Sequence, residues 1–241
     1  VISATRRVPS ALGETLTWPF KDKSNYPRTL GGSNGELYLL WADNSTPRLV
    51  PRFISTIGGG TAWAASPVTL PAMEQAAGPS ENGPGHRDAN WPSLVMGGKG
   101  ELYVVWQERD SKSRTNVLFN RSTDGGATWL PVSRRLNTPT PGGQTSRLPV
   151  IALDEAGGVY VVWEDSRHNT SDLYLNRSLD GGATWLEQDL WLTAVRPHLA
   201  TAIKPLLRAD SAGHLYLLWT DMREIKSSLY FTHSSDRGAS W

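Results

Sequence analysis

Serine and aspartate recur two residues apart at three places, in the stretches STDGGATW, SLDGGATW and SSDRGASW. A hydroxyl beside a carboxylate is a combination that nucleophilic and acid–base catalysis can use. The aspartates Asp124, Asp180 and Asp236, however, follow one another at a constant spacing of 56 residues. Because Asp and Ser side chains also bond nearby backbone amides and stabilise tight turns, we interpret these residues as parts of a repeated turn.

Arginines form a second set of candidate residues, because guanidinium groups bind carboxylates through paired hydrogen bonds. They stand in related loops together with the polar stretch GHRD of the longest connection, and the candidate binding residues are Arg87, Asp88, Arg109, Arg167 and Arg223. A solvated polar loop also explains GHRD. Arg223 follows Arg167 after 56 residues, so salt bridges to neighbouring aspartates would be enough to account for both.

Other chemistries find little support in the composition. The 241 residues contain no cysteine, which excludes disulfides, thiolate metal sites and cysteine nucleophiles. The five histidines are scattered without ligand spacing, so we expect no metal site and no cofactor. The formal net charge of +1 argues against nucleic acid or an anionic membrane as the main partner. No apolar run approaches the roughly 18 residues that a transmembrane helix needs.

The elements that must position these residues are short strands. Runs such as PVIAL, GVYVVW and SDLYLNRS are rich in β-branched and aromatic residues and are separated by turn signals. The second run recurs four times and ends at Trp41, Trp106, Trp163 and Trp219. A proline opens an apolar stretch before each of them, at Pro27, Pro92, Pro149 and Pro205. Four short strands in a unit of about 56 residues predict an all-β fold, a β-propeller of four-stranded antiparallel blades.

We expect one propeller domain over residues 1–241, with blades at about 26–80, 81–140, 141–196 and 197–241. The last blade ends at its turn tryptophan and lacks an outer strand. An open blade edge exposes unpaired backbone groups. We therefore predict that part of Val1–Trp18, within the N-terminal segment 1–25, pairs with SLYFTHSS and closes the ring. The alternative is that the four blades belong to a larger propeller.

The turns resemble the Asp-box, or BNR repeat, of sialidase-like β-propellers, with three full matches over about residues 26–241. The resemblance implies export to the periplasm or the extracellular space, and a structural role for the turns. Glycine in them supplies backbone angles that other residues resist, and tryptophan wedges between neighbouring sheets. The structural residues are Ser122, Asp124, Gly126, Trp129, Ser178, Asp180, Gly182, Trp185, Ser234, Asp236, Gly238 and Trp241.

The same resemblance offers a catalytic alternative, since sialidases hold a carboxylate with an arginine triad and use an aspartate as acid and base. SRLP resembles their Arg-x-Pro signature, which makes Arg147 the first triad candidate, with Arg167 and Asp172 in the same blade. No tyrosine stands out as a nucleophile. We therefore expect a non-catalytic exported propeller that binds a protein or glycan partner or serves as a subunit of a larger assembly. The alternative is a sialidase-type glycoside hydrolase.

Overall fold

The computed structural model of the chain describes residues 26–33, 35–43, 49–57, 62–64, 66–71, 89–109, 114–139, 145–193, 201–223 and 226–241. These residues form strands, turns and loops, and no helix occurs among them. Within this part of the chain there is consequently no helix long and apolar enough to cross a bilayer.

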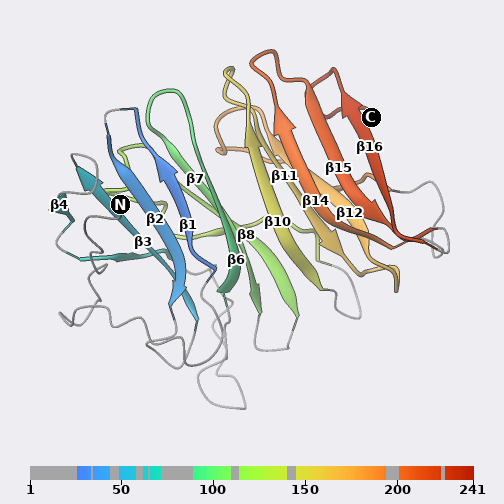
Figure 1. Cartoon of the computed structure of the whole chain (residues 1–241), viewed down its shortest axis with the longest axis horizontal. Helices are drawn as coiled ribbons and strands as arrows, with labels where there is room; N and C mark the ends of the chain where they lie inside the picture. Colours follow the sequence, from blue (N-terminus) through green and yellow to red (C-terminus); the bar gives the residue numbers. More distant parts are fainter. Residues whose placement is uncertain are drawn as a thin grey trace, which may run out of the picture.

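The strands form four consecutive antiparallel sheets, which we call blades 1 to 4 (Figure 1). Blade 1 contains β1 (Arg28–Gly31), β2 (Leu37–Asp43), β3 (Val50–Ile57) and β4 (Ala62–Trp63), with β5 (Val68–Thr69) also paired to β3. Blade 2 contains β6 (Ala89–Met96), β7 (Leu102–Arg109), β8 (Thr115–Ser122) and β9 (Arg134–Arg135). Blade 3 contains β10 (Ser146–Leu153), β11 (Val159–Asp165), β12 (Asp172–Ser178) and β13 (Leu190–Trp191). Blade 4 contains β14 (Ala202–Ala209), β15 (Leu215–Asp221) and β16 (Ser228–Ser234).

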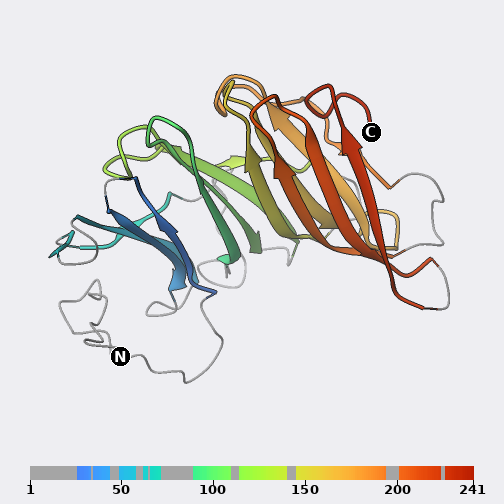
Figure 2. The same cartoon turned by 45° about the horizontal axis from the view of Figure 1, so that its top comes forward.

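The first strand of each blade packs against the first strand of the next, from β1 through β6 and β10 to β14. These four strands, which we call the axial strands, lie along the inside of the row. Both views show blade 1 and blade 4 at opposite ends of that row (Figures 1 and 2). The predicted all-β propeller fold is confirmed, and the described blades form an open arc. The segment Val1–Trp18 lies outside the described residues, so its pairing with β16 stays a prediction.

The core consists of three apolar layers, one between each pair of neighbouring blades. Successive side chains of a strand point to opposite faces of its sheet. In β11, Val161 and Trp163 therefore pack toward blade 2, whereas Tyr160 and Val162 pack toward blade 4. All seven residues of β11 are buried, because blade 3 is covered on both faces.

We call the Ser-x-Asp-x-Gly-x-x-Trp turn the Asp-box turn because it resembles that repeat. It has the same hydrogen bonds in blades 2, 3 and 4. In blade 3, Ser178 Oγ donates to Asp180 Oδ1 at 2.6 Å and accepts from the Gly182 N–H at 2.8 Å. Asp180 also accepts from the N–H and the hydroxyl of Thr184, at 2.8 and 2.6 Å. The equivalent bonds recur around Asp124 and Asp236. These bonds all run between residues of the turn itself.

Glycine is required in this turn for two reasons. Gly182 has a φ of +83°, a conformation that residues with a Cβ rarely adopt. A Cβ at Gly182 would also lie 2.6 Å from Cζ of Phe119 in the preceding blade. Trp185 then packs edge-on against the same ring, with 4.8 Å between the centroids and 65° between the planes. The repeated turn is therefore an inter-blade contact as well as a local one.

We predict that Trp185→Ala lowers the free energy of unfolding by about 3–5 kcal/mol, as removal of a large buried ring does. Denaturant unfolding measures the change. Leu179→Ala is the matched control, because Leu179 belongs to the same turn but is 46% exposed. Equal midpoints for Trp185→Ala and the unmodified protein would contradict the packing role.

The turns also predict a loss of stability in acid. The hydrogen bonds of Thr128 and Ser122 lower the pKa of Asp124 to about 2, and those of Ser178 and Thr184 lower the pKa of Asp180 further. A carboxylate whose pKa is depressed by folding stabilises the protein above its unfolded pKa of about 4, and this contribution is lost as the pH falls toward 2. We expect the melting temperature to fall over this range, and the deficit of Asp180→Asn relative to the unmodified protein to shrink with it. A deficit that is the same at pH 7 and pH 2 would contradict this linkage.

Candidate functional site

The two ends of the axial strands differ in character. At one end, which we call the turn end, the tight turns into the second strands lie beside the Asp-box turns, as the 2.8 Å bond from Gly181 N–H to Gly157 O shows. At the other end, which we call the bulge end, the pairing of the axial strands with their neighbours shifts register in blades 2, 3 and 4. The shifts fall at Asn90/Ser93, Arg147/Val150 and Ile203/Leu206.

The bulge end holds strained backbone in all four blades. The residue before each repeat proline has a positive φ, at Tyr26 (40°), Trp91 (52°), Leu148 (52°) and Lys204 (56°). Such angles are uncommon for residues other than glycine, and strained residues of this kind concentrate at functional sites. The preceding blade secures two of these bulges: Gln107 Oε1 accepts from Leu148 N–H at 3.0 Å, and Glu164 Oε1 accepts from Lys204 N–H at 2.7 Å.

Arg147 and Glu164 form an ion pair at this end that the repeat does not explain. Nε of Arg147 donates to Oε2 of Glu164 at 2.9 Å, across the β10–β11 ladder. The pairs at the same register in the neighbouring blades are uncharged, Asn90 with Gln107 and Ile203 with Thr220. The Glu164 side chain is 1% exposed, whereas that of Arg147 is 47% exposed. The terminal nitrogens of Arg147 thus form a cation held in place by a buried carboxylate.

An aromatic pair lies at the bulge end of the two preceding axial strands. The rings of Tyr26 and Trp91 stack with 4.0 Å between their centroids and 26° between their planes. Trp91 remains 37% exposed. Exposed aromatic faces with a few fixed polar groups are typical of small-molecule sites. The bulge ends of blades 1 to 3 therefore hold a partly exposed aromatic pair and a half-exposed guanidinium group.

Arg167 serves the fold of blade 3. It bonds both oxygens of Asp165 and both oxygens of Asp189, at 2.7–2.9 Å, and lies 3.9 Å over the ring of Tyr174. Burial opposes the charge on Arg167, but the two carboxylates outweigh burial and raise its pKa above the ordinary value. Its side chain is 8% exposed, so little of the guanidinium group is accessible to a ligand.

Arg223 repeats the arrangement of Arg167 in blade 4, with a 2.5 Å bond to Asp221 and the ring of Tyr230 4.2 Å away. Arg109 is exposed at the end of β7. Arg87 and Asp88 lie outside the described residues. Of the five predicted binding residues, two are therefore engaged in equivalent intrablade contacts.

The structure does not bring the three sialidase-like candidates together. Arg147 pairs with Glu164 on the face of blade 3 that meets blade 4, whereas Arg167 pairs with Asp165 and Asp189 on the face that meets blade 2. Adjacent strand residues point to opposite faces, so Glu164 and Asp165 hold the two arginines apart. Asp172 is buried and accepts hydrogen bonds from the hydroxyls of Thr170 and Thr193 at 3.3 and 3.0 Å.

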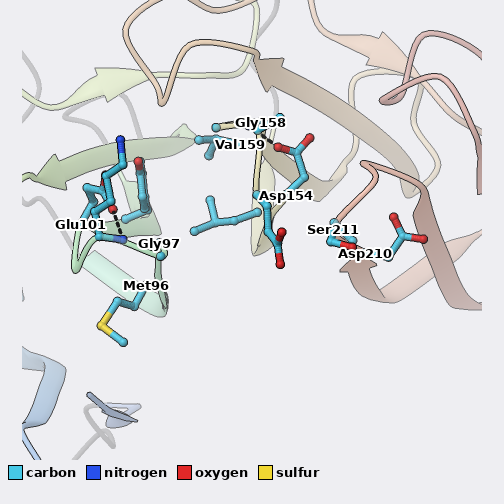
Figure 3. A pocket seen from close by; sticks show the side chains of 16 residues that line it. Met96, Gly97, Glu101, Asp154, Gly158, Val159, Asp210 and Ser211 are labelled. Atoms are coloured by element: carbon cyan, nitrogen blue, oxygen red, sulfur yellow. Dashed lines mark hydrogen bonds between the residues drawn. The ribbon is translucent and has the colours of Figure 1, made fainter. Parts of the chain in front are cut away.

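A cavity of about 740 Å³ opens at the turn end, between the first turns of blades 2, 3 and 4. Figure 3 shows Glu101, Asp154 and Asp210 reaching it from three separate turns. Burial disfavours the charge on Asp154, but bonds from Tyr160, Gly158 and Arg237 lower its pKa. Asp210 is bonded to His214, and Glu101 to the Lys99 N–H. Across the described ranges no group of three or more His, Asp or Glu residues could hold a metal ion. These carboxylates are occupied with holding their own turns.

Comparison with known proteins places the fold. No family model and no curated protein matches the chain. Among solved structures, the α-L-arabinofuranosidase of Fusarium graminearum, of family GH93 and in complex with arabinobiose, has a TM-score of 0.59 at 17% identity over 88% of this chain. The α-L-arabinanase of Penicillium chrysogenum gives 0.55 at 17% identity over 88%, and the endo-arabinase of Bacteroides thetaiotaomicron gives 0.55 at 14% over 98%. At such identities the likeness shows the fold alone.

The chain spans 63% of the length of the two fungal enzymes and 81% of the bacterial one. These structural neighbours are glycoside hydrolases. They contradict the expectation of a non-catalytic propeller that acts as a binding module or structural subunit. That expectation rested on the repetition of Arg167 and Arg223, which is real, and on the lack of a conspicuous tyrosine nucleophile, although Tyr26 stands in a loop-like context. It overlooked Glu164 and Trp91. The signal that could have found Glu164 is its departure from the repeat, because Ala42, Gln107 and Thr220 stand at the equivalent positions.

The inter-blade bond of Glu164 yields a stability prediction. Glu164→Ala leaves Arg147 and the Lys204 N–H without their acceptor and should lower the free energy of unfolding by about 1–3 kcal/mol. Glu164→Gln should cost much less, because Gln107 of blade 2 makes the same bond to the bulge of blade 3. Thermal and denaturant unfolding of both variants measures the difference. Equal losses for alanine and glutamine would show that the acceptor at this position contributes nothing.

Proposed function

We propose that the protein is a glycoside hydrolase that acts on arabinofuranose-containing glycans, with the sugar bound at the bulge end of the axial strands. The observation that carries the proposal is the Arg147–Glu164 pair, in which a buried carboxylate holds a half-exposed guanidinium group at positions that depart from the repeat. The arabinan-cleaving enzymes among the structural neighbours supply the reaction class and the substrate class.

The proposed sugar site uses two kinds of contact. Trp91, stacked on Tyr26, offers an apolar ring face to the carbon skeleton of the sugar. Arg147 offers its terminal N–H groups to sugar hydroxyls. Glu164 is a positioning residue, because its carboxylate holds the guanidinium group through Nε. Glycoside hydrolysis also needs two carboxyl groups flanking the scissile bond. The carboxylates described above are bonded within the fold, so the proposal places neither of these two groups among them.

The Asp-box, sialidase-like assignment is a proposal as well, supported by three turns with the same hydrogen bonds. It extends to export into the periplasm or the extracellular space. A sialidase activity is the second candidate, because Arg147 occupies the Arg-x-Pro position and is half exposed. The separation of Arg147 from Arg167 on opposite faces of blade 3 weighs against it.

Hydrolysis assays test the proposal. We expect turnover of arabinobiose, arabinan or an aryl α-L-arabinofuranoside, and none of an aryl sialoside. Arg147→Ala should lower kcat/KM about 10- to 100-fold, the equivalent of losing one or two hydrogen bonds to a charged group. Arg208→Ala is the matched control, since Arg208 is an exposed arginine near the turn end of β14.

Glu164→Gln separates positioning from folding. The variant keeps the acceptor for the Lys204 N–H but loses the charge that holds Arg147, so KM should rise while kcat changes little. Absence of turnover on every arabinofuranoside by the folded protein would contradict the proposed substrate class. Sialoside turnover abolished by Arg147→Ala would establish the second candidate instead.

A further inference from the structure

Blade 4 presents an apolar face on the side away from blade 3. Leu229 is 73% exposed, Phe231 57% and Leu206 48%. Leu206, Leu218 and Phe231 stand in one row across β14, β15 and β16, because the two ladders place them opposite one another. The ring of Phe231 stacks with that of His233 beside it. Contiguous exposed apolar side chains of this kind mark interaction surfaces.

The same positions are fully buried in the preceding blades. Leu173 and Leu175 in blade 3 correspond to Leu229 and Phe231 after a shift of 56 residues, and both are 0% exposed. Phe119 holds the Phe231 position in blade 2 and is also 0% exposed. The exposed fractions differ because a following blade covers these side chains in blades 2 and 3, whereas blade 4 has no following blade among the described residues.

What covers these positions is the Asp-box turn of the following blade. Phe53 contacts the turn of blade 2, edge-on to Trp129 with 5.0 Å between the centroids. Phe119 contacts Gly182 and Trp185 of blade 3 in the same way. A Cβ at Gly238 of blade 4 would lie 3.4 Å from Leu175. One apolar side chain of the third strand thus meets one turn glycine in each of the three interfaces.

The interface between blades 2 and 3 and that between blades 3 and 4 each also contain a hydrogen bond to the turn. Arg121 donates to Gly181 O, and Arg177 donates to Arg237 O, so a side chain of each third strand reaches the turn of the next blade. His233 holds the equivalent position in blade 4. Its imidazole can donate one hydrogen bond to a carbonyl, as the two arginines do.

We propose that this face of blade 4 binds a further β-sheet of the Asp-box type, with the turn glycine over Phe231 and the turn tryptophan edge-on to the ring. The occupant is defined by its chemistry: a close backbone approach without a Cβ, a large aromatic edge, and a carbonyl within reach of His233. The inference is independent of the proposed activity, because it rests on three repeated interfaces and not on the bulge end.

The chain supplies its own probe. Residues 186–241 make up one full period, from the residue after Trp185 to Trp241. A protein extended by a second copy of this segment after Trp241 carries one more Asp-box unit in the correct phase. We expect the extension to fold. Its first residues also supply a strand that can pair with the edge of β16, as β13 pairs with β12, so the face contact is measured through Phe231.

Phe231→Ala is the decisive substitution. In the 241-residue protein it should change the melting temperature little, because the ring is exposed; in the extended protein it should lower it by several degrees, as expected for a newly buried ring. Phe119→Ala should lower the melting temperature of both proteins, and Leu179→Ala should lower that of neither. The same small shift for Phe231→Ala in both proteins would overturn the proposal. An extension that stays unfolded would overturn it too, since the same residues fold against blade 3.

A second copy of the chain is the rival occupant. Sedimentation of the 241-residue protein over a range of concentrations distinguishes the two. A monomer at all concentrations, together with a larger effect of Phe231→Ala in the extended protein, supports an added Asp-box sheet. A dimer that Phe231→Asp dissociates would overturn the proposed occupant and identify the face as a contact between copies.

Discussion

The contact between one apolar side chain and the Asp-box turn of the next blade is the constraint on which the arc depends. Phe119 fills the space over Gly182, where no Cβ fits, and meets the edge of Trp185. The glycine is required by its positive φ and by this close approach, so local and inter-blade demands fall on one residue. Each turn therefore sets the spacing of two sheets while satisfying its own hydrogen bonds.

The two ends of the axial strands are held together in different ways. This difference explains at which end the side chains of a functional site can lie. The turn end is built from bonds that recur, and its carboxylates are engaged in them, as Asp154 is with the Gly158 N–H and Asp210 with the His214 N–H. At the bulge end, backbone hydrogen bonds join neighbouring blades, from Ala89 N–H to Leu49 O and from Ala202 N–H to Ser171 O, beside the bond from Lys204 N–H to Glu164. Side chains at this end can therefore differ from blade to blade without loss of the fold, and Arg147, Glu164 and Trp91 do differ. Variable residues on a repeated scaffold are a common basis of function in such folds.

The sequence repeat predicted the fold correctly but did not predict the candidate site. It predicted the turn residues and offered salt bridges as one account of Arg167 and Arg223, which were also binding candidates. Both arginines lie against carboxylates and tyrosine rings. It also led to a non-catalytic interpretation, because attention went to the residues that recur. Glu164 was overlooked since it neighbours the conspicuous Trp163 and Asp165 and looks like part of the same motif. Comparing equivalent positions blade by blade would have singled it out.

The sequence by itself determined the all-β propeller, the 56-residue unit, and the turn chemistry of Ser178, Asp180 and Gly182, because these depend on spacing and local bonding that can be read along the chain. Only the tertiary structure decided which face of a blade each polar side chain occupies. A one-residue change of register reverses every side chain of a strand, and the bulges before the repeat prolines introduce such changes. For this reason Arg147 and Arg167, which look like partners in the sequence, lie on opposite faces of blade 3. The exposure of Phe231 was likewise a tertiary result, since burial of that position depends on a neighbouring sheet and not on its own strand.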